Sequence, residues 1–120
     1  MILCDTNILI EFYKNTPELV GELRKIGQHQ LAVSAITQAE LYFGALDKAE
    51  LQKIKNHLSL LFVIPIDSHI SIQFISLMEK YSLSHKLSIP DALIVSTAWV
   101  HQQELYTLND KGFCFIVSIR

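Results

Sequence analysis

The sequence predicts an α/β fold in which helices cover both faces of a mostly parallel central sheet of four to five strands. Short apolar segments of strand length alternate with longer segments whose apolar residues recur every three or four positions, and this alternation is typical of parallel sheets. The chain has 120 residues, half of them hydrophobic and 18% charged. Because such a chain can bury a core without disulfides, we expect one domain spanning residues 1–120.

Five segments have the composition of strands. The first is a buried apolar run that ends in an acid. The third contains Pro65, which favours an edge position because proline cannot donate a hydrogen bond to a neighbouring strand. The expected strands are residues 2–5, 31–34, 63–66, 105–108 and 115–119.

The segments between these strands have the periodicity of amphipathic helices. Pro17 fits a first helical turn, where its missing amide hydrogen is harmless. The last segment is mostly apolar, so we expect it deep in the fold. Two expected helices begin near residues 7 and 17. A third begins at about residue 37 and has Leu41, Phe43 and Leu46 as apolar positions. The other three cover residues 51–61, 68–82 and 90–103.

Four acidic residues lie where a predicted strand ends and a helix begins: Asp5, Glu40, Asp91 and Asp110. In an open α/β sheet, ligands bind at the carboxyl ends of the strands, so we expect these side chains to gather at one edge. Gathered carboxylates raise each other's pKa unless a cation neutralises them. Hard oxygen ligands suit Mg²⁺ or Mn²⁺, so the pattern predicts a metal site.

Each of these acids also fits a helix cap. A threonine or serine followed three residues later by an acid is typical of a capping box, in which the acid bonds back to the capping amide. The candidate caps are Thr37 with Glu40, Ser88 with Asp91, Thr107 with Asp110, and Asp5 alone. The capping and metal-binding interpretations are compatible, because a helix N-terminus favours an ionised carboxylate. Asp67 is expected to cap the helix at 68–82.

Other classes of site find little support. The chain has no G-x-S-x-G segment, no glycine-rich phosphate loop and no histidines at metal-ligand spacing, which disfavours acyl, ATP and NAD chemistry. A net charge of −2 gives no overall attraction to nucleic acid. The start resembles no signal peptide, and no apolar run approaches the ~20 residues of a membrane span. Cys4 and Cys114 lie in apolar strand segments, so we expect a cytoplasmic protein with buried, reduced thiols.

Four segments together resemble the PIN domains, and within them the VapC-like toxins of type II bacterial toxin–antitoxin pairs. They are ILCDTNILI at residues 2–10, SAITQAELYFG at 34–44, IPDALI at 89–94 and YTLNDKGF at 106–113. A single D-x-N string is common, but all four segments in this order and spacing are specific. The resemblance covers essentially the whole chain and implies a three-layer α/β/α PIN-like fold.

The resemblance also implies a set of site residues. Asp5, Glu40 and Asp91 match the acids that bind Mg²⁺ or Mn²⁺ in such proteins. A further acid usually follows the asparagine of the last segment by three residues, and that position is Gly112 here. Asp110 or Asn109 would then take its place. The candidates for orienting ligands, water or substrate are Thr6, Asn7, Thr107 and Asn109.

The activity that the resemblance implies is metal-dependent endoribonuclease cleavage of single-stranded RNA by a VapBC-type toxin. Lys14, Lys86 and Lys111 are candidate contacts to the RNA backbone. The implied partners are a cognate antitoxin and a second copy of the chain. One alternative is a catalytically impaired PIN-like module that binds RNA or a partner. Another is a phosphoacceptor receiver domain using Asp67, although such a domain needs paired acids after its first strand.

Overall fold

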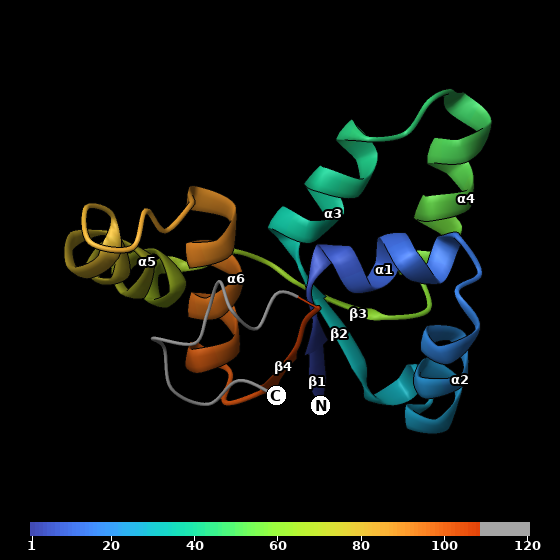
Figure 1. Cartoon of the computed structure of the whole chain (residues 1–120), viewed down its shortest axis with the longest axis horizontal. Coiled ribbons are helices and arrows are strands. Elements are labelled where there is room, and N and C mark those ends of the chain that lie inside the picture. The colour runs from blue at the N-terminus through green and yellow to red at the C-terminus, as the bar shows by residue number, and fades with distance from the viewer. Residues whose placement is uncertain (109–120) are drawn as a thin grey trace.

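The computed structural model describes residues 1–108, and a sheet of parallel strands lies at its centre (Figure 1). The strands within these residues are β1 (Ile2–Cys4), β2 (Leu31–Ser34), β3 (Phe62–Ile64) and β4 (Glu104–Tyr106). They lie in the order β3-β2-β1-β4, and every neighbouring pair is parallel. The predicted parallel sheet is confirmed, and the carboxyl ends of its strands meet at one edge.

Helices connect the strands in the order that the sequence predicts. They are α1 (Thr6–Tyr13), α2 (Pro17–Ile26), α3 (Ala35–Phe43), α4 (Lys48–Leu58), α5 (Ser68–Tyr81) and α6 (Ile89–Val100), with a 3₁₀ turn at Gln28–Gln30. Every residue of α6 from Ala92 to Ala98 is buried, as its apolar composition predicts. None of the helices within residues 1–108 has both the length and the apolar composition that crossing a membrane requires.

The sheet separates two hydrophobic cores, because successive residues of a strand point to opposite faces. Leu3 and Leu105 pack with apolar residues of α5 and α6. Cys4 and Val33 pack on the other face with residues of α1, α2 and α4. Figure 1 shows these two groups of helices on opposite sides of the strands. The predicted three-layer α/β/α architecture is therefore confirmed.

Several predicted boundaries differ from the structure. β3 ends at Ile64, before Pro65, because the proline has no amide hydrogen for the ladder, while its predicted edge position is correct. α3 ends at Phe43, so Leu46 lies beyond the helix, and the side chains of Phe43 and Leu46 are 94% and 87% exposed. The strand predicted at 115–119 lies outside the described residues.

Candidate functional site

Asp5 lies at the carboxyl end of β1, where it caps α1. Its Oδ1 accepts a hydrogen bond from the Thr6 amide at 2.7 Å, and its Oδ2 accepts one from the Thr107 hydroxyl at 2.6 Å. Thr107 follows β4, so this carboxylate joins the ends of two neighbouring strands. Asp5 is only 5% exposed, and these bonds compensate in part for removing its charge from water. Both the capping role of Asp5 and its place at the sheet edge match the predictions.

Glu40 is oriented by a hydroxyl from another helix. The Thr6 hydroxyl of α1 donates to Glu40 Oε1 at 2.7 Å, and the Thr6 and Thr37 hydroxyl oxygens lie 3.0 Å apart. The predicted Thr37 cap is wrong. α3 begins two residues earlier than expected, and the Ser34 hydroxyl caps it by accepting from the Ile36 amide at 3.2 Å. Thr37 is consequently a buried residue of the first helical turn.

Asp91 lies in the first turn of α6, and its amide donates to the Ser88 hydroxyl at 3.2 Å, as the capping pattern predicts. The pKa of Asp91 is raised, first by burial and then by the charges of Asp5 and Glu40, and a hydrogen bond of its side chain with Ser88 opposes this only in part. The charges of Asp5 and Glu40 therefore lie near enough to Asp91 to disfavour its ionisation. That repulsion is what a bound cation would relieve.

The donor chemistry of this cluster fits a divalent cation. Three carboxylates offer the hard oxygen ligands that Mg²⁺ and Mn²⁺ prefer. Within residues 1–108, however, no three Asp, Glu, His or Cys side chains are gathered in an arrangement that could hold a metal ion. Asp5, Glu40 and Asp91 interact electrostatically here but are not gathered around one point. The predicted ligands Asn109 and Asp110, like Gly112, lie outside the described residues.

Asn7 and Asp67 have structural contacts. Asn7 Oδ1 accepts from the Leu108 amide at 3.3 Å, which ties the segment after β4 to α1. Asp67 accepts from the Ile70 amide at 2.9 Å and caps α5, as expected. Lys86 is exposed in the loop before α6, and Lys111 lies outside the described residues.

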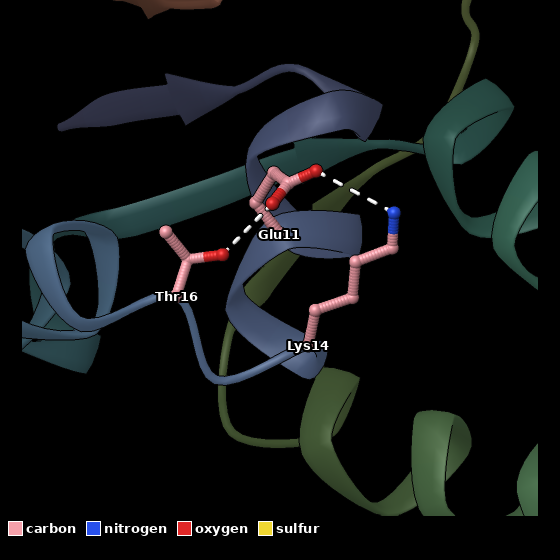
Figure 2. Close-up of polar contacts among 3 residues, drawn as sticks. All are labelled: Glu11, Lys14 and Thr16. Atoms are coloured by element: carbon pink, nitrogen blue, oxygen red, sulfur yellow. Dashed lines mark hydrogen bonds and ion pairs between the residues drawn. The ribbon is translucent and has the colours of Figure 1, made fainter.

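Glu11 lies near the end of α1, and its side chain contacts the turn that follows this helix rather than the acidic cluster. Figure 2 shows its carboxylate between two partners: the Thr16 hydroxyl donates to it at 2.8 Å, and Lys14 Nζ lies 3.6 Å away. The chain between them turns at Asn15, whose φ is 60°. Glu11 and Lys14 thus stabilise the passage from α1 to α2, and Lys14, predicted as an RNA contact, is paired with Glu11.

A cavity of about 670 Å³ opens beside Glu40, between α1, α3 and α4. Its lining is mainly apolar, including Ile10, Leu41 and Ile54. Tyr13 of α1 and His57 of α4, joined by a 2.8 Å hydrogen bond, also line it. The cavity therefore places apolar surface directly next to one member of the acidic cluster.

Asp91→Asn is expected to raise the melting temperature of the metal-free protein near neutral pH, by a few degrees. The folded-state pKa of Asp91 lies above its unfolded value, so the stability that this group contributes is present at low pH and lost as pH rises through the folded-state pKa. Asparagine carries no charge at any pH, so its advantage should vanish under acidic conditions, where Asp91 is protonated in both states. Thermal unfolding in chelator at neutral and acidic pH measures this difference.

Asp67→Asn is the control for that measurement, because it replaces an exposed helix cap with another good one. A lower melting temperature for Asp91→Asn than for wild type at neutral pH would contradict the electrostatic coupling of Asp91 to Asp5 and Glu40.

Comparison with known proteins gives one family and a consistent set of structures. The family model described as PIN domain matches residues 2–116. A chain in a toxin–antitoxin complex from Klebsiella pneumoniae is 34% identical, with a TM-score of 0.86 over 100% of this chain and 96% of that one. A chain of DNA-bound VapBC from Salmonella typhimurium is 25% identical, with a TM-score of 0.82 over 99% of this chain and 94% of that one. A chain of FitAcB from Neisseria gonorrhoeae is 25% identical, with a TM-score of 0.77 over 95% of this chain and 91% of that one. None of the curated proteins compared with the chain matches it.

Proposed function

Because the chain belongs to the PIN domain family, we propose that it is a metal-dependent endoribonuclease that cleaves single-stranded RNA as the toxin of a VapBC-type pair. PIN domains are generally nucleases. The observation that carries the proposal is the electrostatic coupling of Asp91 to Asp5 and Glu40 at the carboxyl edge of the sheet. The receiver-domain alternative is wrong, since the matched family is different and Asp67 caps a helix.

The proposed reaction is hydrolysis of a phosphodiester bond. Asp5, Glu40 and Asp91 would hold Mg²⁺ or Mn²⁺, which supplies activation of a water and neutralises charge on the phosphate. Thr107 and the Thr6 amide keep Asp5 in place, while the Thr6 hydroxyl keeps Glu40 in place. A carboxylate would accept the proton of the water as it adds to phosphorus, and the P–O bond to the leaving oxygen would break, with that oxygen taking a proton from solvent.

A cleavage assay with metal removal tests this function. Purified protein should cut labelled single-stranded RNA in Mg²⁺ or Mn²⁺, stop cutting when a chelator is added, and resume when the ion is restored. Duplex RNA and single-stranded DNA of the same sequence serve as comparison substrates. Cleavage that persists in chelator would contradict the proposed metal dependence.

A catalytically impaired RNA-binding module is the second candidate function. Gly112 stands where PIN domains resembling this chain usually have a further acid, and this substitution favours the alternative. Such a module would retain single-stranded RNA in a binding assay under conditions where no cleavage occurs with either metal ion.

An antitoxin is the proposed protein partner. A 34% identical chain lies in a structure described as a toxin–antitoxin complex. The cavity between α1, α3 and α4 suits an amphipathic helix, whose apolar anchors would contact Ile10 and Ile54. A basic side chain of that helix would reach Glu40 at the cavity wall and block the acidic cluster.

A homodimer is the proposed assembly, formed through the outer face of α5. Ile72 and Ile75 on that face are 71% and 53% exposed, and they line one shallow hollow. Ile72→Asp should convert a dimer to a monomer in light scattering at tens of micromolar protein, because an exposed isoleucine pair stabilises association by burial. Leu83→Asp, a change at a 93% exposed leucine outside the hollow, is the control. A monomeric wild type would contradict the assembly.

A further inference from the structure

We propose that Thr37 is a positioning residue for the metal site, acting through Thr6 on the Glu40 carboxylate. The inference rests on the proposed function, because it assumes that Glu40 holds a divalent ion. What it adds is a role for a buried hydroxyl that is not itself a metal ligand. Thr37 lies three residues before Glu40 on α3, so both side chains project from the same side of the helix.

The Thr37 hydroxyl, the Thr6 hydroxyl and the Glu40 carboxylate form a continuous series of hydrogen bonds from the core to the site. Thr37 is fully buried, with 0% of its surface exposed. Its hydroxyl oxygen lies 3.0 Å from that of Thr6, and the Thr6 oxygen lies 2.7 Å from Glu40 Oε1. These hydrogen bonds connect Thr6 of α1 to Thr37 and Glu40 of α3, which lie 31 and 34 positions later in the sequence.

The proton count gives this series of hydrogen bonds a direction. Thr6 has one hydroxyl proton, and an ionised Glu40 can only accept. The Thr6 proton therefore points to Glu40, and the hydroxyl of Thr37 supplies the proton between the two threonines. With Thr37 as donor, the Thr6 oxygen accepts one hydrogen bond while its own O–H donates to the Glu40 carboxylate. Without the Thr37 hydroxyl, Thr6 keeps only its bond to Glu40, and its rotamer is less constrained.

Thr6 also sets the separation between two members of the acidic cluster. Its amide donates to Asp5 Oδ1 at 2.7 Å, while its side chain donates to Glu40. A fixed Thr6 rotamer thus relates Glu40 to Asp5 through one residue. Groups behind metal ligands commonly change metal affinity 10–100-fold when they are removed, which is the range expected for the loss of this relay.

Two substitutions at Thr37 separate its hydroxyl from its shape. Thr37→Val keeps the branched side chain and removes the hydroxyl, and we expect it to weaken Mn²⁺ binding about tenfold or more in calorimetry. Thr37→Ser keeps the hydroxyl and should bind Mn²⁺ close to wild type. Calorimetry measures ion affinity directly and does not depend on RNA cleavage.

Thr97→Val is the matched control. Thr97 is also a fully buried helical threonine, but its hydroxyl donates to the Leu93 carbonyl at 2.8 Å. Both valine variants should lose similar stability in thermal unfolding, because each loses one buried hydrogen bond. Only Thr37→Val should lose Mn²⁺ affinity. Equal affinity losses in the two variants would overturn the inference, as would wild-type affinity in Thr37→Val.

Variants of Thr6 keep the test decisive if Thr37→Val does not fold. Thr6→Val removes the middle hydroxyl at a half-buried position and should weaken Mn²⁺ binding at least as much. Full affinity in Thr6→Val would also overturn the inference. Glu40→Gln identifies a failure of the proposed function instead: if it binds Mn²⁺ as tightly as wild type, Glu40 is not a ligand, whatever the threonine variants do.

Discussion

Asp5→Asn is expected to lower the rate of Mg²⁺-dependent RNA cleavage about 100-fold or more, the loss typical of removing one preorganised charge-stabilising group. Asp5 is 5% exposed, and its two oxygens are held by Thr6 and Thr107. Asparagine has nearly the same shape, and its amide oxygen can still accept from the Thr6 amide. The substitution therefore removes the charge while leaving the end of β1 in place. Initial rates on labelled single-stranded RNA measure the effect.

Asp47→Asn provides the matched control for this rate measurement. Asp47 is an exposed cap of α4 that accepts from the Glu50 amide at 2.8 Å, and asparagine caps a helix equally well. This variant should cleave RNA at the wild-type rate. An Asp5→Asn variant that is folded and as active as Asp47→Asn would remove Asp5 from the catalytic site.

Expression of the chain alone in a bacterial host is expected to arrest growth. The proposed reaction destroys RNA in the host, so a single active protein is sufficient for the effect. Asp5→Asn should restore growth, and so should co-expression of a small neighbouring gene that encodes an antitoxin. Colony counts after induction, compared at equal protein levels, measure the effect.

Ile10→Asp separates inhibition from catalysis in the same assay. Ile10 is 41% exposed and lines the cavity beside Glu40, so the substitution removes one apolar anchor for an antitoxin helix. A variant that arrests growth and is no longer rescued by the antitoxin is expected. If the wild-type protein is harmless at high expression while the purified protein cleaves RNA efficiently, the toxin role is contradicted. A housekeeping nuclease would then be the better account.

The local signals in the sequence predicted the parts of the site that depend on neighbouring residues. Asp5 caps the helix that follows β1, and Ser88 caps the helix that carries Asp91, because each cap needs only a backbone amide within three residues. The alternation of strands and helices likewise predicted the three-layer fold. Both kinds of signal are visible over a few consecutive residues.

The interactions that the sequence did not predict join distant segments. Ser34 and Thr37 are both acceptable helix caps, and local pattern does not distinguish them. The structure uses Ser34 and leaves the Thr37 hydroxyl to meet Thr6, a contact across thirty-one positions. The spacing of Thr37 and Glu40 was a usable signal, because residues three apart share a helix face.

The exposure of Phe43 also depends on distant segments. Phe43 is apolar, but α3 ends there and the chain turns away toward α4. No periodic pattern reports which side of a helix end is covered by other elements. Burial at such a position is decided by the tertiary arrangement alone, and here the side chain is 94% exposed.

The most direct test of the proposed metal site is anomalous diffraction from a crystal soaked in Mn²⁺. We expect an anomalous peak between Asp5, Glu40 and Asp91, with carboxylate oxygens of all three within about 2.0–2.3 Å of the ion. The same crystals of Asp5→Asn should lose the peak or lower its occupancy. A Mn²⁺ peak bound only elsewhere on the protein, or a peak at this edge that is unchanged in Asp5→Asn, would contradict it.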